Sequence, residues 1–123
     1  MNAISIDYGN KRIGLAISIQ GIIQPLCVVR NDDKFLDQLN KVILDYQIEK
    51  IFVGISQGEF AIQTKKFVDK LKHVITLPIE TVEEAVSTIE ADQIYLANKK
   101  PKKDYKKNID AIAAAVILKR VIG

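Results

Sequence analysis

Residues 12–19 alternate between apolar and small or polar side chains, and this alternation restricts the fold more than any other feature of the chain. The apolar positions are Ile13, Leu15, Ile17 and Ile19. Because successive side chains of a strand point to opposite faces, these residues share one face of a strand. A short apolar run at residues 2–7 precedes it, and Gly9 and Asn10 in between tolerate the positive φ of a tight turn. We therefore predict a β-hairpin, with residues 25–30 as the third strand of a meander.

After this meander the apolar residues follow a helical period. The predicted helices are residues 33–47, opened by Asp32 or Asp33, Phe60 to Leu71, 88–98 and 109–122, and the predicted strands between them are 50–56 and 74–79. Phe35, Phe60 and Phe67 are expected in the core by their spacing. The order of elements describes an α/β domain that spans residues 1–123. Its five-stranded mixed sheet combines the antiparallel meander with parallel strands, and helices cover both faces.

The composition is that of an ordinary globular protein, with 48% hydrophobic and 27% charged residues. The lone cysteine, Cys27, cannot form an internal disulfide. No run approaches the ~20 apolar residues that a membrane span needs. The charged residues near the start, such as Asp7 and Lys11, do not fit a signal peptide. We therefore expect a cytoplasmic protein without membrane association.

The net charge of +3 is too small to indicate a nucleic-acid partner by itself, but the charge is unevenly distributed. Residues 99–107 contain six lysines and one acid, Asp104. A concentrated basic segment binds phosphates by displacing counterions. A solvated connector between two elements has the same composition, so both interpretations of this segment stay open.

Four motifs resemble the YqgF family in the right order and cover nearly the whole chain. The opening SIDYGNKRIGLAIS resembles that family's strand D-x-G-x-K-R followed by G-x-A-x-S. The segments IEKIFVGIS, EEAVSTIEA and KKNIDAIAAAVIL resemble its EKIVVGLP strand, its D-E-R-L-T-T-x-E-A segment and its terminal K-x-x-x-D-x-x-A-A-x-x-I-L helix. The resemblance implies a ribonuclease H-like fold related to Holliday junction resolvases. It also implies divalent-metal nuclease chemistry and a role in maturing the 5′ end of pre-16S ribosomal RNA.

Two segments depart from the family pattern. Glu83-Glu84-Ala85 stands where the family has D-E-R, so the arginine is missing. The loop after the strand IEKIFVGIS, which is longer in the family, is shortened here to residues 56–59, Ser-Gln-Gly-Glu. Both changes lie where a substrate phosphate would be handled, so they bear on activity and substrate choice rather than on the fold.

Metal-assisted hydrolysis of a phosphodiester needs about three or four converging carboxylates. The candidate catalytic and metal-binding residues are Asp7, Glu84 and Asp110, with Glu83 in reserve. Their hard oxygen atoms favour Mg²⁺ or Mn²⁺. Carboxylates that lie close together repel one another, and a bound cation relieves that repulsion.

Each of these acids also has a purely structural explanation. Asp7 precedes a Gly-Asn turn and could accept local backbone N–H groups there. Thr81 to Glu84 forms a capping box for a helix, and Ser87 to Glu90 forms a second one; only the second would leave Glu84 in a strand-to-helix loop. Asp110 follows a possible Asn108 cap, in a first helical turn where the macrodipole favours an acid.

The hairpin register decides whether these carboxylates converge. If Asp7 pairs with Arg12, then Ala3, Ser5, Gly14 and Ala16 share its face of the sheet. That face is made of small side chains, and so is the alanine-rich helix 109–122. Small surfaces permit close approach, so we predict that this helix packs there and brings Asp110 towards Asp7.

Three functional hypotheses follow. The first is a metal-dependent endonuclease acting on structured RNA, with pre-rRNA favoured over junction DNA, possible contact with ribosomal particles, and a monomeric or weakly dimeric state. Its predicted phosphate contacts are Lys11, Arg12, Lys102, Lys103, Lys106 and Lys107. The second is a non-catalytic nucleic-acid-binding relative, and the third an actin-like or sugar-kinase-like ATPase, an architecture that needs two such domains where this chain has one.

Overall fold

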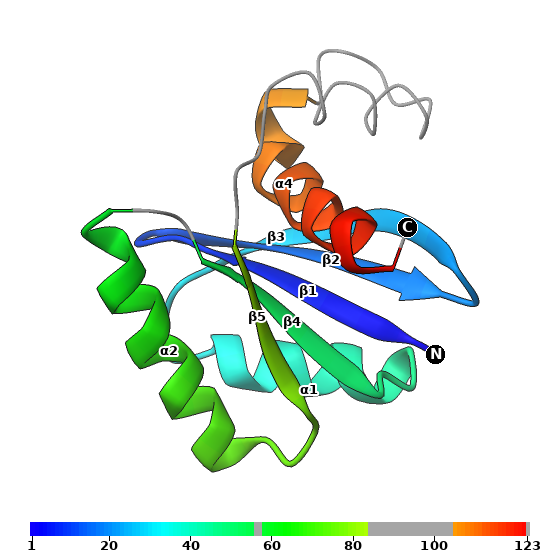
Figure 1. The fold of residues 1–123 in the computed structure, drawn as a ribbon, viewed down its shortest axis with the longest axis horizontal. Coiled ribbons are helices and arrows are strands. Elements are labelled where there is room, and N and C mark those ends of the chain that lie inside the picture. The colour runs from blue at the N-terminus through cyan, green and yellow to red at the C-terminus, as the bar shows by residue number, and fades with distance from the viewer. Residues whose placement is uncertain (56–57, 84–104, 123) are drawn as a thin grey trace.

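The computed structural model describes residues 1–55, 58–83 and 105–122 (Figure 1), and within the last range it describes side chains from residue 109 onward. The strands are β1 (Ala3–Tyr8), β2 (Arg12–Ile19), β3 (Ile22–Arg30), β4 (Lys50–Ile55) and β5 (Ile79–Glu83). The helices are α1 (Phe35–Asp45), α2 (Phe60–Val74) and α4 (Tyr105–Val121). The predicted helix 88–98 lies outside the described residues.

The strands form one five-stranded sheet in the order β3-β2-β1-β4-β5. β1, β2 and β3 pair antiparallel, whereas β4 pairs parallel with both β1 and β5. The predicted mixed sheet with an antiparallel meander is therefore confirmed. Because β1, β4 and β5 run in the same direction, their carboxyl ends meet at one edge of the sheet. We call this the carboxyl edge.

Helices cover both faces of the sheet, as predicted (Figure 1). The alternating positions Ile13, Leu15 and Ile17 are fully buried on the face shared with α1 and α2. The opposite face carries a second core, in which Ala3, Ala16 and Phe52 contact the residues of α4. A strand buried on both faces explains why β1 and β2 show almost no exposed positions between Ala3 and Ser18 apart from their connection.

Small residues let α4 approach the sheet closely. Ser5, which is fully buried, donates its hydroxyl to the backbone carbonyl of Ala114. A Cβ atom at Gly14 would overlap the carbonyl group of Asp110 and would lie 2.8 Å from the amide nitrogen of Ala111. The predicted packing of the alanine-rich helix on the small-residue face is therefore confirmed. At Gly14 the helix lies so close to β2 that a side chain would not fit between them.

The hairpin register differs from the predicted one by two residues. Asp7 pairs with Gly14 rather than with Arg12, and Ser5 pairs with Ala16. A shift of two keeps every side chain on its predicted face, because the side-chain period of a strand is also two. The reason given for Gly9 was wrong as well: the described residues with positive φ are Gln20, Gln47, Gly21 and Gly58. Gly9 is needed for space, since a Cβ there would lie 2.5 Å from the carbonyl oxygen of Arg12.

Several predicted boundaries are also corrected. The strand expected at 74–79 begins at Ile79, because α2 continues to Val74 and β5 pairs with β4 only from Ile79 onward. Thr81 lies within β5, so it does not cap a helix.

The starts of the last helix, the third strand and the first helix also differ from those predicted. α4 begins at Tyr105 rather than at 109, which places Asp110 beyond the first turn and removes Asn108 as its cap. The third strand starts at Ile22, and α1 starts at Phe35 with Lys34 at its N-cap position instead of Asp32 or Asp33.

Within the described ranges, none of the helices has both the length and the apolar character required to cross a membrane.

Candidate active site

Asp7 lies one residue before the end of β1, at the carboxyl edge, and its neighbours on both sides are glycines. It pairs with Gly14 of β2 and with Gly54 of β4. Paired residues share a face, so the two residues that flank half-buried Asp7 on the adjacent strands carry no side chain. The sequence places an acid at a strand end, and the sheet sets glycine backbone on both sides of it, with α4 lying against Gly14.

Asp110 reaches the same place from α4. Its backbone carbonyl lies directly against Gly14, the residue that pairs with Asp7. Further along, Ala114 of α4 contacts Ser5 of β1, so α4 runs antiparallel to β1 with its amino-terminal half over the carboxyl edge. The tertiary structure therefore brings Asp7 and Asp110 to one end of one sheet face, as predicted from the small residues.

The carboxylate of Asp110 is engaged by Arg12. Arg12 Nε donates to Asp110 Oδ2 at 3.0 Å, with the two side chains 65% and 27% exposed. Arg12 also pairs with Arg30 on β3, so two basic residues occupy paired positions where these strands begin and end. In the structure Arg12 balances the charge of Asp110, and its contact with phosphate stays a prediction.

The remaining predicted residues are placed as follows. Lys11 is exposed in the β1–β2 connection, where its backbone carbonyl accepts a hydrogen bond from the backbone N–H of Asn31 at 3.0 Å. Lys106 and Lys107 belong to α4 rather than to a loop, and their side chains are not described. Glu84, Lys102 and Lys103 lie outside the described residues.

Glu83, the reserve ligand, is the last residue of β5 and pairs with Ile55. The adjacent pair, Val82 with Gly54, lies on the same face as Asp7. Because successive side chains alternate, Glu83 belongs to the opposite face of the sheet. Glu83 therefore does not converge with Asp7, and it is withdrawn as a ligand.

The donor chemistry at the carboxyl edge fits a divalent cation. Asp7 and Asp110 supply hard oxygen atoms of the kind that Mg²⁺ and Mn²⁺ prefer. Among the described residues, no three carboxylate, histidine or cysteine side chains gather in one metal-binding group. Asp7 and Asp110 would thus supply only part of a ligand set, and a further carboxylate would be needed to complete it.

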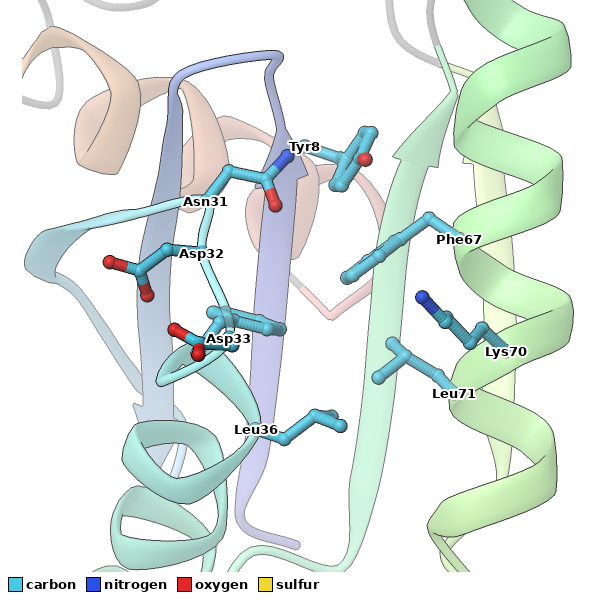
Figure 2. A pocket seen from close by; sticks show the side chains of 9 residues that line it. Tyr8, Asn31, Asp32, Asp33, Leu36, Phe67, Lys70 and Leu71 are labelled. Atoms are coloured by element: carbon cyan, nitrogen blue, oxygen red, sulfur yellow. The ribbon is translucent and has the colours of Figure 1, made fainter.

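The sequence analysis missed a hollow on the other face of the same edge (Figure 2). It has a volume of ≈320 Å³ and is lined by Tyr8, Phe67 and Lys70, among others. The Tyr8 and Phe67 rings stack with their centroids 4.1 Å apart, and Tyr8 also stacks on Phe60 at 5.8 Å. Phe60 and Phe67 were expected in the core, but both are only partly buried. The sequence feature that could have indicated this hollow is Tyr8, an aromatic residue directly after the candidate catalytic Asp7.

Burial raises the pKa of the Cys27 thiol above its usual value, because desolvation disfavours the thiolate. Cys27 pairs with Leu15 and therefore lies on the α1/α2 face of the sheet, away from Asp7. The lone cysteine is thus a structural residue and not a nucleophile of this site.

Comparison with known proteins now identifies the family. The family model named RuvX, described as Holliday junction resolvase, matches residues 1–123. This chain belongs to the RuvX family. A protein of Desulforamulus reducens, provisionally named a pre-16S rRNA nuclease, is 36% identical over 131 residues, covering 96% of this chain and 93% of that protein. The resemblance drawn from the four motifs is confirmed.

Solved structures support the fold of this RuvX family member. RuvC from Thermus thermophilus has a TM-score of 0.62 at 15% identity, with 98% of this chain and 96% of that chain covered. The Holliday junction resolvase of fowlpox virus has a TM-score of 0.55 at 16% identity, with the same coverage. The predicted ribonuclease H-like fold is confirmed by these neighbours.

Proposed function

We propose that this chain is a divalent-metal-dependent endonuclease that hydrolyses phosphodiester bonds in structured RNA, in the 5′-end maturation of pre-16S ribosomal RNA. The observation that carries the proposal is the seating of α4 on Gly14, which brings Asp110 to the end of the sheet where Asp7 lies. The names of the related proteins support a nuclease and favour pre-16S RNA as its substrate.

Asp7 and Asp110 hold the cations in this proposal, with Glu84, directly after β5, as the third ligand. Bound Mg²⁺ or Mn²⁺ supplies an activated water and neutralises the charge that develops on the leaving oxygen. The protein's own residues orient the substrate and keep the acids in place. Gly14 lets α4 approach and so places Asp110 near Asp7, and Arg12 balances the charge of Asp110.

Phosphate contacts come from Lys11 in the exposed β1–β2 connection and from the basic segment that leads into α4. Lys102, Lys103, Lys106 and Lys107 precede Asp110 closely in the sequence, and this proximity along the chain is the reason for assigning them phosphate contacts. Phosphate contacts position a nucleic acid without selecting its sequence. We place the protein in the cytoplasm, in contact with ribosomal precursor particles, as a monomer or weak dimer.

A labelled RNA that spans the precursor 5′ extension and the mature start of 16S rRNA tests the proposal. We expect cleavage with Mn²⁺ or Mg²⁺ and none after chelation with EDTA. Absence of cleavage with either metal, although the RNA binds, would favour the non-catalytic hypothesis. Mn²⁺ soaked into crystals then decides whether the acids bind metal at all, because its anomalous signal locates the ion.

Junction DNA is the second candidate substrate, because the family description and the solved neighbours name Holliday junction resolvases. A synthetic four-way DNA junction, tested with the same metals and protein concentration, separates the two. Cleavage of the junction with symmetric products, and not of the RNA, would assign the chain to DNA.

A further inference from the structure

We propose that the hollow beside Tyr8 binds an unpaired base of the RNA strand, and that Lys66 and Lys70 on α2 hold the phosphate next to that base. The proposal rests on the proposed nuclease function, because it assigns the hollow to the same strand that reaches Asp7. It adds a binding site on the face of the sheet opposite the candidate metal ligands.

One wall of the hollow is aromatic, and because its rings already stack on one another, a base would pack against the outside of this group and not between two rings. Tyr8 and Phe67 stack at 4.1 Å with an angle of 24° between their planes, and Phe35 lies 5.7 Å from Phe67 at 52°. Figure 2 shows Tyr8 at the end of β1 and Phe67 on α2, both facing the space between α1 and α2. The volume of ≈320 Å³ falls in the range of small-ligand pockets. Nucleobases of every sequence stack on such rings, because each base has a π face.

The polar groups at the rim are arranged on two sides. On one side the ammonium group of Lys70 points towards the hollow (Figure 2). On the other, Asn31 donates from Nδ2 to the carbonyl of Gly9 at 2.8 Å, which holds its amide at the rim. Asp32 also lines the hollow, but its carboxylate accepts from the backbone nitrogen of Lys34 at 3.0 Å. Asp33 lines the same side as a second carboxylate, so the anionic part of a ligand would lie on the opposite side, at Lys70 on α2.

A second, more open depression of ≈450 Å³ continues the first along α2. It is lined by Tyr8, Gln63, Lys66, Phe67 and Lys70. Lys66 and Lys70 are separated by one helical turn, so their side chains are neighbours on the exposed surface of α2. α2 carries four lysines and one aspartate. A base in the deeper hollow would therefore have a two-lysine site beside it for the adjoining phosphate.

Continuity with the candidate active site selects a nucleic-acid strand over a free small molecule. Tyr8 follows Asp7 directly, so their Cα atoms are about 3.8 Å apart, and their side chains point to opposite faces of the sheet. A strand that crosses the carboxyl edge can thus present a phosphate on the Asp7 side and an unstacked neighbouring base on the Tyr8 side. Recognition of splayed bases by aromatic side chains is typical of single-stranded RNA binding.

Fluorescence of 2-aminopurine tests the site with the full chain. A short single-stranded RNA carrying this base is titrated with protein in EDTA, so that binding is measured without cleavage. We expect quenching on binding to the wild-type protein. Phe67→Leu, which keeps an apolar side chain but removes the ring, should reduce the quenching and weaken affinity about five-fold or more. Circular dichroism checks that this variant folds.

Lysine variants provide a test that does not depend on the folding of Phe67→Leu. Lys70→Gln should weaken binding and lower the slope of log affinity against log salt by about 0.7. Lys72→Gln is the matched control, because Lys72 is exposed on the same helix but lines neither hollow. Equal effects of Lys70→Gln and Lys72→Gln, or equal quenching by wild type and folded Phe67→Leu, would overturn the proposal.

Cleavage of the same RNA in Mn²⁺ by the wild-type protein reports the proposed function separately. Metal-dependent cleavage without quenching would contradict the proposed base-binding site and support the proposed nuclease function. If the wild-type protein quenches the fluorescence, Phe67→Leu abolishes that quenching and no metal supports cleavage, the base-binding site is supported and the nuclease function is contradicted.

Discussion

Arg12 Nε donates to Asp110 Oδ2 at 3.0 Å across 98 positions of sequence. This contact joins the start of β2 to α4 at the point where the helix passes Gly14. A carboxylate that faces a guanidinium is already compensated in charge, so a cation that binds Asp110 has to compete with Arg12 or share the acid with it. The pair is therefore expected to influence metal affinity more than stability.

Replacing Arg12 with Gln should raise affinity for Mn²⁺ by up to about five-fold, because an exposed ion pair of this kind contributes no more than ~1 kcal/mol. The free energy of unfolding should fall by a similar or smaller amount. Calorimetric titration with Mn²⁺ measures the affinity. Arg30→Gln is the control, since it removes the same charge from the adjacent strand. Weaker Mn²⁺ binding in Arg12→Gln would show that Arg12 organises the site instead of competing for it.

Gly14→Ala should destabilise the protein by about 1–3 kcal/mol, because the added methyl group meets the backbone of Asp110 and Ala111 and α4 has to move outward. Urea unfolding measures this loss, and RNA cleavage should fall with it as Asp110 shifts. Gly21→Ala serves as the control: its φ of +82° makes alanine strained, but no atom lies within 4 Å of the new Cβ. If Gly14→Ala is no less stable than wild type, the close seating of α4 is incorrect.

Ser5 and Ser18 are both fully buried under α4 and form a matched pair for testing its contacts. Ser5→Ala should lose about 0.5–1.5 kcal/mol, because the hydroxyl donates to the carbonyl of Ala114. Within the described part of the chain, the hydroxyl of Ser18 has no hydrogen-bond partner. Ser18→Ala should therefore be neutral or slightly stabilising. Chemical denaturation of the two variants side by side checks the order, and a larger loss for Ser18→Ala would contradict it.

Asp7→Asn should reduce RNA cleavage by orders of magnitude while the fold survives, because the amide keeps the shape of the carboxylate but removes the charge that a cation needs. Initial cleavage rates in Mn²⁺, together with the circular dichroism spectrum, measure both effects. Asp45→Asn removes an exposed carboxylate near the end of α1 and should leave the rate unchanged. Full activity in Asp7→Asn would exclude the proposed metal site.

Changing Lys102, Lys103, Lys106 and Lys107 together to Gln should weaken RNA binding and flatten its salt dependence, by roughly 0.7 to 0.9 in log–log slope for each lost phosphate contact. Affinity measured at several salt concentrations gives that slope. The control replaces four exposed lysines elsewhere, Lys34, Lys41, Lys72 and Lys119, so that both proteins have the same net charge. Identical slopes for the two quadruple variants would mean that the basic segment is only a solvated connector.

The sequence alone determined the order and type of the described elements and the faces of the hairpin. The alternation in residues 12–19 is a local property of the chain, and the burial of Ile13, Leu15 and Ile17 follows from it. Small residues on one face of β1 and β2, and on α4, were enough to predict which surfaces meet. The family could likewise be recognised from motifs that each lie within a short segment of the sequence, and the family match confirmed it.

Only the tertiary structure decided the contacts between elements. The pairing of Asp7 with Gly14, the bond from Arg12 to Asp110 and the stacking of Tyr8 on Phe67 join residues from different elements. A two-residue change in register leaves every local pattern intact, so no periodicity could distinguish Gly14 from Arg12 as the partner of Asp7. Register and docking depend on the packing of whole surfaces, whereas strand and helix periods depend only on neighbours along the chain.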